Sequence, residues 1–361
     1  MKIKSARLEN FMLFDDFDMA WSPNINVICG SNSTGKTVLI KFMYALLKAW
    51  RDTDTEKETK EGIHSAFFKK LTGVFRPDDQ LIGRLVRRQQ GYSQCGCQII
   101  LDNSESIEMG FSSRAKSRLE PLNYPSKVDG VDPLNTAIYI PPKEIISATE
   151  NFRYLYEDMH IAFEETYYDL AKLLDRPLKK GSNTPEQQRV LNKLGEIMHG
   201  DINQRENRFY LRESENREFE MGLVSEGYRK LATIAYLIKN GSLNANSVLF
   251  WDEPETNMNP KMIHPLVETL MLLAKLGVQV FITTHDYFLQ QYFNLAAAYP
   301  EANPDHLDIK FVSLYRPEGK DAVIQYEVAA QASDLEHNTI MEEFDTIYDR
   351  EQGFIYGDTR E

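Results

Sequence analysis

Three things are scarce in this chain, and each absence excludes a class of protein. Only 3 cysteines occur among 361 residues, too few for the disulfide framework of a small secreted protein. No apolar run approaches the roughly 20 residues that a membrane helix needs, so no membrane association is expected. The 41 basic residues are outnumbered by 54 acidic ones, and the net charge of −13 argues against a protein that coats nucleic acid.

The remaining composition, 42% hydrophobic and 26% charged, is that of an ordinary soluble globular protein. The start, Met1–Lys4, has no signal-peptide core, so a cytoplasmic location is expected. Cys95 and Cys97 lack a second Cys/His pair with matching spacing, which favours strand residues over a metal site. Arg84, Arg87 and Arg88 are the best candidates for a local basic groove, and a solvated positive face explains them at least as well.

Hydrophobic periodicity predicts an α/β protein. Strands alternate with helices in the last third of the chain, which indicates a mainly parallel sheet covered on both faces. Residues 145–174 have helical periodicity and many aromatics, a pattern that favours helix packing over base stacking. Residues 52–61 read as an exposed linker. Strands are expected within 2–21 and at 25–29, 94–101, 107–111, 136–140, 248–251, 278–283, 309–314 and 322–328, a hairpin within 209–221, and helices at 38–50, 186–198, 228–240, 261–276, 286–298 and 338–350.

The segment Gly30–Thr37 reads G-x-x-x-x-G-K-T, with an apolar strand before it and a helix-compatible run after it. This arrangement aims backbone N–H groups and a helix N-terminus at phosphate oxygens. Lys36 is expected to reach the β- and γ-phosphates, and Thr37 to offer its hydroxyl to Mg²⁺. An ordinary Gly/Ser turn is the alternative. The predicted nucleotide-binding residues of the loop are Gly30, Asn32, Ser33, Thr34, Gly35, Lys36, Thr37 and Val38.

A second motif, V-L-F-W-D-E-P-E at 248–255, is an apolar strand that ends in two adjacent carboxylates. A doubly buried strand delivers its last residues to the carboxyl edge of the sheet, beside the phosphate loop. Asp252 can hold Mg²⁺ or its water there, and Glu253 can orient or deprotonate an attacking water. The alternative is a strand that merely stops in an acidic turn.

Two further motifs are weaker when taken alone. In V-S-E-G-Y-R-K, Ser225 and Gly227 lie at a helix start, with Ser225 a plausible N-cap. In F-I-T-T-H-D, a strand ends with His285 at its tip, where it can sense a γ-phosphate. A lone histidine is more often structural.

All four motifs, in this order, resemble those of soluble ABC-type ATPases, above all RecF/SMC-like ATPases and the ATPase part of OLD-family proteins. K-S-A-R-L-E-N-F-M-L-F at 4–14 looks like the N-terminal strand of that group. The likeness covers residues 1–50 and 220–290 well. It implies a P-loop NTPase of ABC-ATPase type: a mixed, mainly parallel sheet flanked by helices, with an antiparallel β subdomain and a helical insertion.

The resemblance also divides the chain. An N-terminal ATPase lobe is expected at 1–142, a helical insertion at 143–206, a C-terminal lobe at 207–330 and a helical tail at 331–361. Two departures stand out. Only Ser225 and Gly227 of the usual L-S-G-G-Q signature carry over, and Glu144 stands where a switch glutamine is expected.

The resemblance implies a mechanism with ATP and Mg²⁺. Ser225 and Gly227 of one copy would contact ATP held by another copy, so that ATP closes a head-to-tail homodimer or higher homo-oligomer and hydrolysis opens it. Such a switch would control a separately encoded effector, a nuclease or toxin, in bacterial anti-phage defence. About 70 residues follow His285, too few for a nuclease domain of ordinary size.

Three alternatives remain open. A RecF-like DNA-repair ATPase would bind DNA, and the acidic balance weakens that reading. The ATPase half of a membrane transporter is disfavoured by the N-terminal pattern and the aromatic insertion. A structural protein without nucleotide is hard to reconcile with four ordered motifs.

Overall fold

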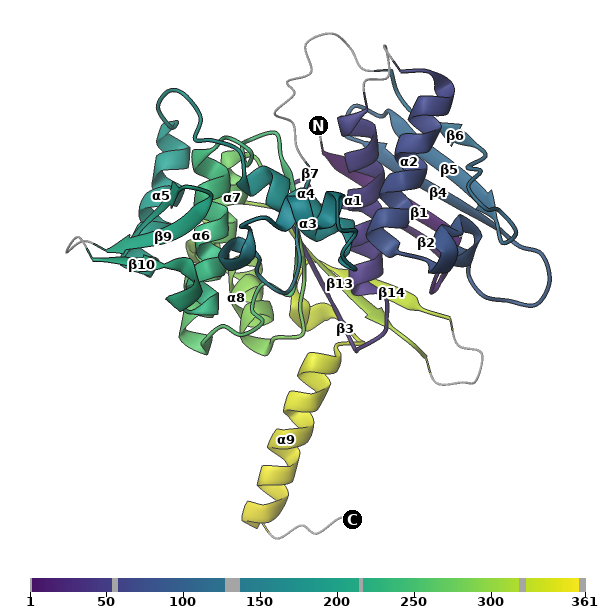
Figure 1. The fold of residues 1–361 in the computed structure, drawn as a ribbon. Helices are drawn as coiled ribbons and strands as arrows, with labels where there is room; N and C mark the ends of the chain where they lie inside the picture. The colour runs from purple at the N-terminus through teal and green to yellow at the C-terminus, as the bar shows by residue number, and fades with distance from the viewer. Residues whose placement is uncertain (1, 54–57, 127–136, 214–216, 318–322, 357–361) are drawn as a thin grey trace.

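The computed structural model describes residues 2–53, 58–126, 137–213, 217–317 and 323–356 (Figure 1). Residues 54–57 of the expected linker, Thr136 and Ala322 lie outside these ranges. No helix in the described part of the chain is long and apolar enough to span a bilayer.

A central sheet organises the described part of the chain. Its strand order is β14 (Gln325–Ala329), β13 (Ile309–Tyr315), β3 (Ile25–Gly30), β12 (Gln279–Thr283), β11 (Val248–Asp252) and β7 (Ala137–Ile140). Neighbouring strands are parallel except for β13 and β14. Every residue of β3, β11 and β12 is buried, because both faces of the sheet are covered. The predicted fold class is therefore confirmed.

One face of the central sheet carries α1 (Lys36–Asp52), which a second sheet covers in turn. That antiparallel sheet has the order β2 (Phe14–Ala20), β1 (Ile3–Phe11), β4 (Gln94–Leu101), β5 (Ser106–Ser112) and β6 (Leu122–Asn123), with α2 (Lys60–Phe75) beside it. Because α1 lies between two sheets, its residues from Leu39 to Trp50 are almost all buried. Cys95 and Cys97 are strand residues of β4, as predicted.

The opposite face carries a second hydrophobic core. Successive residues of β3 divide between the two cores: Val27 joins the second and Ile28 the first. The helices over this face are α4 (Glu165–Leu174), α5 (Pro185–Met198), α6 (Glu226–Lys239), α7 (Ile263–Leu276) and α8 (Tyr287–Ala298).

One local expectation was wrong within the described residues. Residues 145–174 do not form one helix: α3 (Phe152–Glu157) ends before α4 begins, and His160 between them has a left-handed φ of 50°. The aromatic pattern reflects packing across this break, since the rings of Tyr156 and Tyr168 stack with centroids 4.6 Å apart. The predicted helix packing is thus confirmed.

The expected hairpin within 209–221 is confirmed, and a third strand extends it. Strand β9 (Arg208–Glu213) pairs with β10 (Glu218–Glu220) and also with β8 (Gly200–Arg205), which lies in the range predicted as a helical insertion. The predicted boundary at 206 therefore falls in the turn between two paired strands. The C-terminal helix α9 (Thr339–Tyr356) is longer than expected and projects away from the body (Figure 1).

A buried ionic cluster fixes α1 relative to α2 and α4. The Lys70 ammonium on α2 lies 2.8 Å from Asp169 and 2.5 Å from Glu165, both on α4. The Tyr44 hydroxyl on α1 donates to the same Asp169 at 2.6 Å. The two carboxylates raise the pKa of Lys70 against the lowering effect of burial. The helix that starts at the phosphate loop is thereby tied to the insertion.

Replacing Lys70 is expected to destabilise the fold strongly. Lys70→Met leaves Asp169 buried without its counter-ion, a change that costs about 3–5 kcal/mol. The matched control is Lys275→Met, which removes an ion pair whose two side chains are each 37% exposed, and which should cost less than about 1 kcal/mol. Denaturant unfolding of the two variants checks this, and equal shifts in the free energy of unfolding would contradict it.

Candidate nucleotide site

The predicted phosphate loop connects β3 to α1 and requires its two glycines. Gly30 has a φ of +136°, and a Cβ there would lie 2.1 Å from the carbonyl oxygen of Leu314. Gly35 has a φ of +97°, and a Cβ would meet the ring of Phe14 at 2.9 Å. The first N–H groups of α1 have no partner within the helix and face the loop. The local geometry is that of an anion-binding helix N-terminus.

Lys36 is held over the loop. Its ammonium donates to the carbonyl oxygens of Gly30 at 2.8 Å and Ser31 at 2.9 Å. Burial lowers its pKa to about 8, and the carboxylates of Glu253 and Asp252 oppose that shift. The enclosed Lys36 ammonium can form charge-assisted hydrogen bonds to phosphate oxygens, which are stronger than hydrogen bonds between neutral groups.

Asp252 stands at the centre of the site. Its side chain is almost fully buried and accepts hydrogen bonds from the hydroxyls of Thr37 at 3.0 Å, Thr283 at 2.5 Å and Tyr139 at 2.9 Å. The two residues predicted to hold metal, Thr37 and Asp252, are therefore in direct contact. A hydroxyl and a carboxylate are oxygen ligands of the kind that Mg²⁺ prefers, so this donor set fits the ion.

Glu253 and His285 lie next to each other, as their motifs require. Glu253 has a left-handed φ of +46°, a strained conformation for a non-glycine residue. The Thr283 hydroxyl accepts its N–H at 3.1 Å, and His285 Nε2 lies 3.2 Å from its carboxylate. Burial and the charge of Lys36 lower the pKa of His285, so a neutral imidazole makes this contact at pH 7.

Glu255, to which the sequence assigned no role, is a further member of this site. Its Oε1 accepts from the Thr284 hydroxyl at 2.7 Å and from the His285 N–H at 3.1 Å. Its buried Oε2 has no partner among the described residues, and burial raises the pKa of this carboxyl to about 7. Glu255 thus connects the loop after β11 to the backbone of His285.

Helix α6 reaches the same edge of the sheet from the other side. Lys230, itself buried, donates to the carbonyl oxygens of Glu253 at 3.4 Å, Pro254 at 3.3 Å and Thr256 at 2.7 Å. Arg229 pairs with Glu144 in the loop after β7. Glu144, considered as a replacement for the switch glutamine, is thus bound to the signature helix.

Ser225 and Gly227 are placed differently from the other predicted residues. Ser225 is the N-cap of α6, but its exposed hydroxyl makes no capping hydrogen bond. Gly227 is buried, and a Cβ there would lie 3.4 Å from Met258. Within the described residues, no hydrogen bond or ion pair joins either of them to loop residues 30–38. A single copy of the chain does not unite the two halves of the predicted site.

Sequence reasoning missed Tyr139, Thr283, Lys230 and Glu255. Thr283 and Glu255 lie inside motifs that were identified, and their polarity next to buried strand ends was an available signal. Tyr139 was placed on a predicted strand, but only the pairing of β7 with β11 brings it to Asp252.

Removing the Lys36 ammonium is expected to weaken nucleotide binding. A charge-assisted hydrogen bond contributes about 1.5–3 kcal/mol, so Lys36→Ala should bind ATP ~10- to 100-fold more weakly. Lys41→Ala on the same helix, which removes an ion pair with Glu164, is the matched control and should bind normally. Calorimetric titration with ATP decides, and equal affinities of the two variants would refute the role of Lys36.

The carboxyl of Glu255 is expected to make stability depend on pH. Its pKa is raised from 4.5 to about 7 in the folded state. The folded state therefore favours the protonated form, so stability falls as pH rises through this interval and the full penalty applies above it. Glu255→Gln should flatten this part of the curve of unfolding free energy against pH. Parallel curves for the two proteins would contradict the assignment.

Comparison with known proteins places the chain in a family. A family model described as "AAA domain, putative AbiEii toxin, Type IV TA system" matches residues 103–289, and an AAA ATPase domain model matches residues 1–170. The DNA replication and repair protein RecF of Staphylococcus haemolyticus is 24% identical over 280 residues, which cover 72% of this chain and 67% of that protein. RecF of Halalkalibacterium halodurans is 37% identical over 78 residues, 21% of this chain and 20% of that protein.

Solved structures agree on the fold. An SMC head bound to the C-terminal winged-helix domain of ScpA has a TM-score of 0.53 at 11% identity, covering 92% of this chain and 99% of that one. The Smc head with an extended coiled coil, bound to the C-terminal domain of ScpA derived from Pyrococcus furiosus, has a TM-score of 0.50 at 10% identity, covering 97% and 99%.

Proposed function

The chain belongs to this AAA-domain family, as an ABC-type, RecF/SMC-like member, and from that premise we propose that it is an ATP-hydrolysing switch that closes as a head-to-tail dimer around ATP. One observation carries the proposal. Lys36, Thr37, Asp252, Glu253 and His285, from α1 and the ends of β11 and β12, lie in one connected cluster.

The residues divide the chemistry between them. The α1 N-terminus and Lys36 bind the phosphates. Thr37 and Asp252 would hold Mg²⁺, which when bound neutralises charge on the phosphate oxygens. Glu253, held beyond the end of β11, is placed to accept a proton from an attacking water. His285 orients the Glu253 carboxylate through its contact at 3.2 Å.

The placement of Ser225 supports a site shared between two copies. Its exposed hydroxyl leaves the helix N-terminus uncapped, and within the described part of the chain it makes no hydrogen bond to the phosphate loop. An uncapped N-terminus of a 14-residue helix suits a γ-phosphate presented by another copy. Lys230 and Arg229 would pass the resulting movement of α6 to the loops after β11 and β7.

We further propose that the switch controls an effector protein. The matched family model describes its AAA domain as a putative toxin of a type IV toxin–antitoxin system, which supports a place for this chain in a system of that kind. A separately encoded nuclease or toxin in anti-phage defence is the partner that fits the proposal.

A RecF-like role in DNA repair is the second candidate, and the RecF relatives favour it. The charge of the chain weighs against it. Arg84 pairs with Asp78, and Arg87 pairs with Asp15, so two of the three candidate basic residues already have carboxylate partners. This candidate requires ATP-enhanced DNA binding that weakens steeply with salt. Failure to bind duplex, gapped or single-stranded DNA at low salt would remove it.

The decisive variant for hydrolysis is Glu253→Gln. It should bind ATP normally, lose turnover by about 100-fold or more, and accumulate as an ATP-bound dimer. Glu206→Gln is the matched control, because Glu206 is an exposed glutamate with a similar φ of 49° in the turn between β8 and β9. Phosphate release and sedimentation report the two effects. Unchanged hydrolysis by Glu253→Gln would overturn the assigned role.

A further inference from the structure

Helix α9 is an unusual element, because it buries none of its residues. It leaves the body and extends into solvent (Figure 1). Most helical stability in proteins comes from packing of an amphipathic face, so a helix that buries no residue gains most from an apolar partner. Its exposed large apolar side chains are Phe344, Ile347, Tyr348, Phe354, Ile355 and Tyr356.

The apolar side chains of α9 form a stripe. They recur at positions 340, 341, 344, 347, 348, 354 and 355, which at 3.6 residues per turn fall on one face. Glu343 and Asp345 flank this stripe, and Glu342 and Asp349 lie on the opposite face. Glu351 lies within the stripe. The whole helix has five acidic residues and one basic residue, Arg350.

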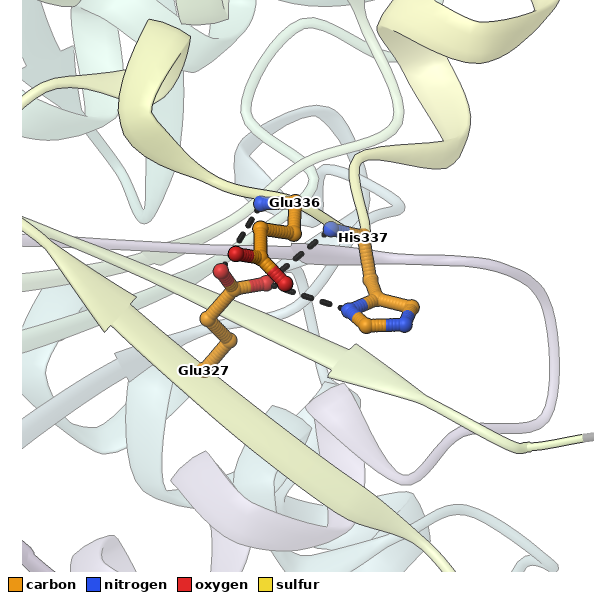
Figure 2. Close-up of side chains that lie close together, drawn as sticks. All are labelled: Glu327, Glu336 and His337. Carbon is orange, nitrogen blue, oxygen red and sulfur yellow. Dashed lines mark hydrogen bonds and ion pairs between the residues drawn. The ribbon is translucent and has the colours of Figure 1, made fainter.

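The base of α9 is fixed to the body of the protein. Glu327 on β14 accepts the backbone N–H groups of Glu336 at 2.8 Å and His337 at 3.0 Å (Figure 2). The His337 ring stacks on Tyr315 of β13 with centroids 3.9 Å apart. Glu327, Glu336 and His337 could be read as metal ligands, but these contacts account for the Glu327 carboxylate as an anchor. The helix therefore leaves the body in a defined direction.

The same base touches the helix that follows the candidate active site. Helix α8 starts two residues after His285, and Asp286 caps it through the Leu289 N–H at 2.7 Å. The Tyr287 ring in its first turn stacks on Phe344 of α9, with centroids 4.6 Å apart and planes within 5°. Gln291 on α8 donates to Met341 of α9. A shift of His285 would reach α9 through this contact.

The charge of α9 distinguishes between the molecules that could bind its apolar stripe: a second copy of α9, a membrane surface or a partner protein. A second copy of α9 would bring two strongly acidic helices together, and like charges repel. A membrane surface rich in anionic lipid would repel the same face. A protein groove with apolar walls and a rim of lysine or arginine satisfies both the stripe and the acidic residues beside it, Glu351 included.

We propose that α9 is the docking arm for a basic partner protein, whose apolar groove takes the stripe and whose lysine or arginine rim pairs with the acidic flanks. The helix enters such a groove as amphipathic helices do, with anchors at i, i+3, i+4 and i+7. A second claim rests on the proposed function: nucleotide bound at the site changes the affinity of the arm through His285, α8 and Phe344.

The test uses the full chain and two synthetic helical peptides as probes, each with the same leucine face. One peptide carries lysine on its flanks and the other glutamate. The full chain should bind the lysine peptide without nucleotide, more weakly as salt rises, and should not bind the glutamate peptide. Ile347→Asp should weaken binding at least about tenfold, because it removes a buried apolar anchor. Thr346→Asp adds the same charge on the polar face and should bind normally.

Several results would overturn the docking claim. The claim fails if both peptides bind equally, or if Ile347→Asp binds the lysine peptide as the native chain does. It also fails if the chain binds phosphatidylserine vesicles through the stripe, or if it forms a nucleotide-free dimer that Ile347→Asp dissociates. Circular dichroism of the variants establishes that α9 remains helical.

Coupling is tested separately. A non-hydrolysable ATP analogue should change peptide affinity in the native chain, and Phe344→Ala should reduce that change. If the chain does not bind the analogue, the proposed function fails while the docking result stands. If the analogue binds and the affinity stays constant, the coupling claim alone fails.

Discussion

The buried carboxylate of Asp252 is the interaction on which the rest of the site depends. A charge so far from water is costly unless hydrogen bonds compensate it. Three hydroxyls do so, from Thr37 on α1, Thr283 on β12 and Tyr139 on β7. Each comes from a different element, so satisfying this carboxylate requires the phosphate loop helix and three strands to meet at one sheet edge. The hydrogen bonds that stabilise the buried charge of Asp252 therefore also fix the geometry of the site.

The layers of the fold hold that edge in place. Because α1 lies between the central sheet and the antiparallel sheet, it cannot move without disturbing both, and the hydrogen bond from Tyr44 to Asp169 ties it to α4 as well. The parts proposed to meet another molecule are exposed. Ser225 stands at an exposed helix start, and α9 touches the body only at its base.

Much of this arrangement could be predicted, for a physical reason. Parallel strands end at the same edge, so motifs that end in Asp252 and His285 had to converge near the loop after β3. The features that could not be predicted depend on the pairing of strands that are distant in the sequence. Strand β8 has few apolar residues and is defined by its partner β9, and Tyr139 contacts Asp252 only because β7 lies beside β11. The break between α3 and α4 was hidden because aromatics packed across it keep helical spacing. The roles of Ser225 and Gly227 stay predictions, since one copy of the chain cannot display a shared site.

Association of two differently disabled chains tests the shared site most directly. Chains with Lys36→Ala, labelled with a donor dye, would be mixed with Ser225→Arg chains that carry an acceptor. One complete site can form in the mixed pair, from the loop of the second chain and the signature of the first. A non-hydrolysable ATP analogue should therefore produce energy transfer in the mixture, and little when either variant is paired with itself. Transfer in the mixture no greater than in those two controls would contradict an ATP site divided between copies.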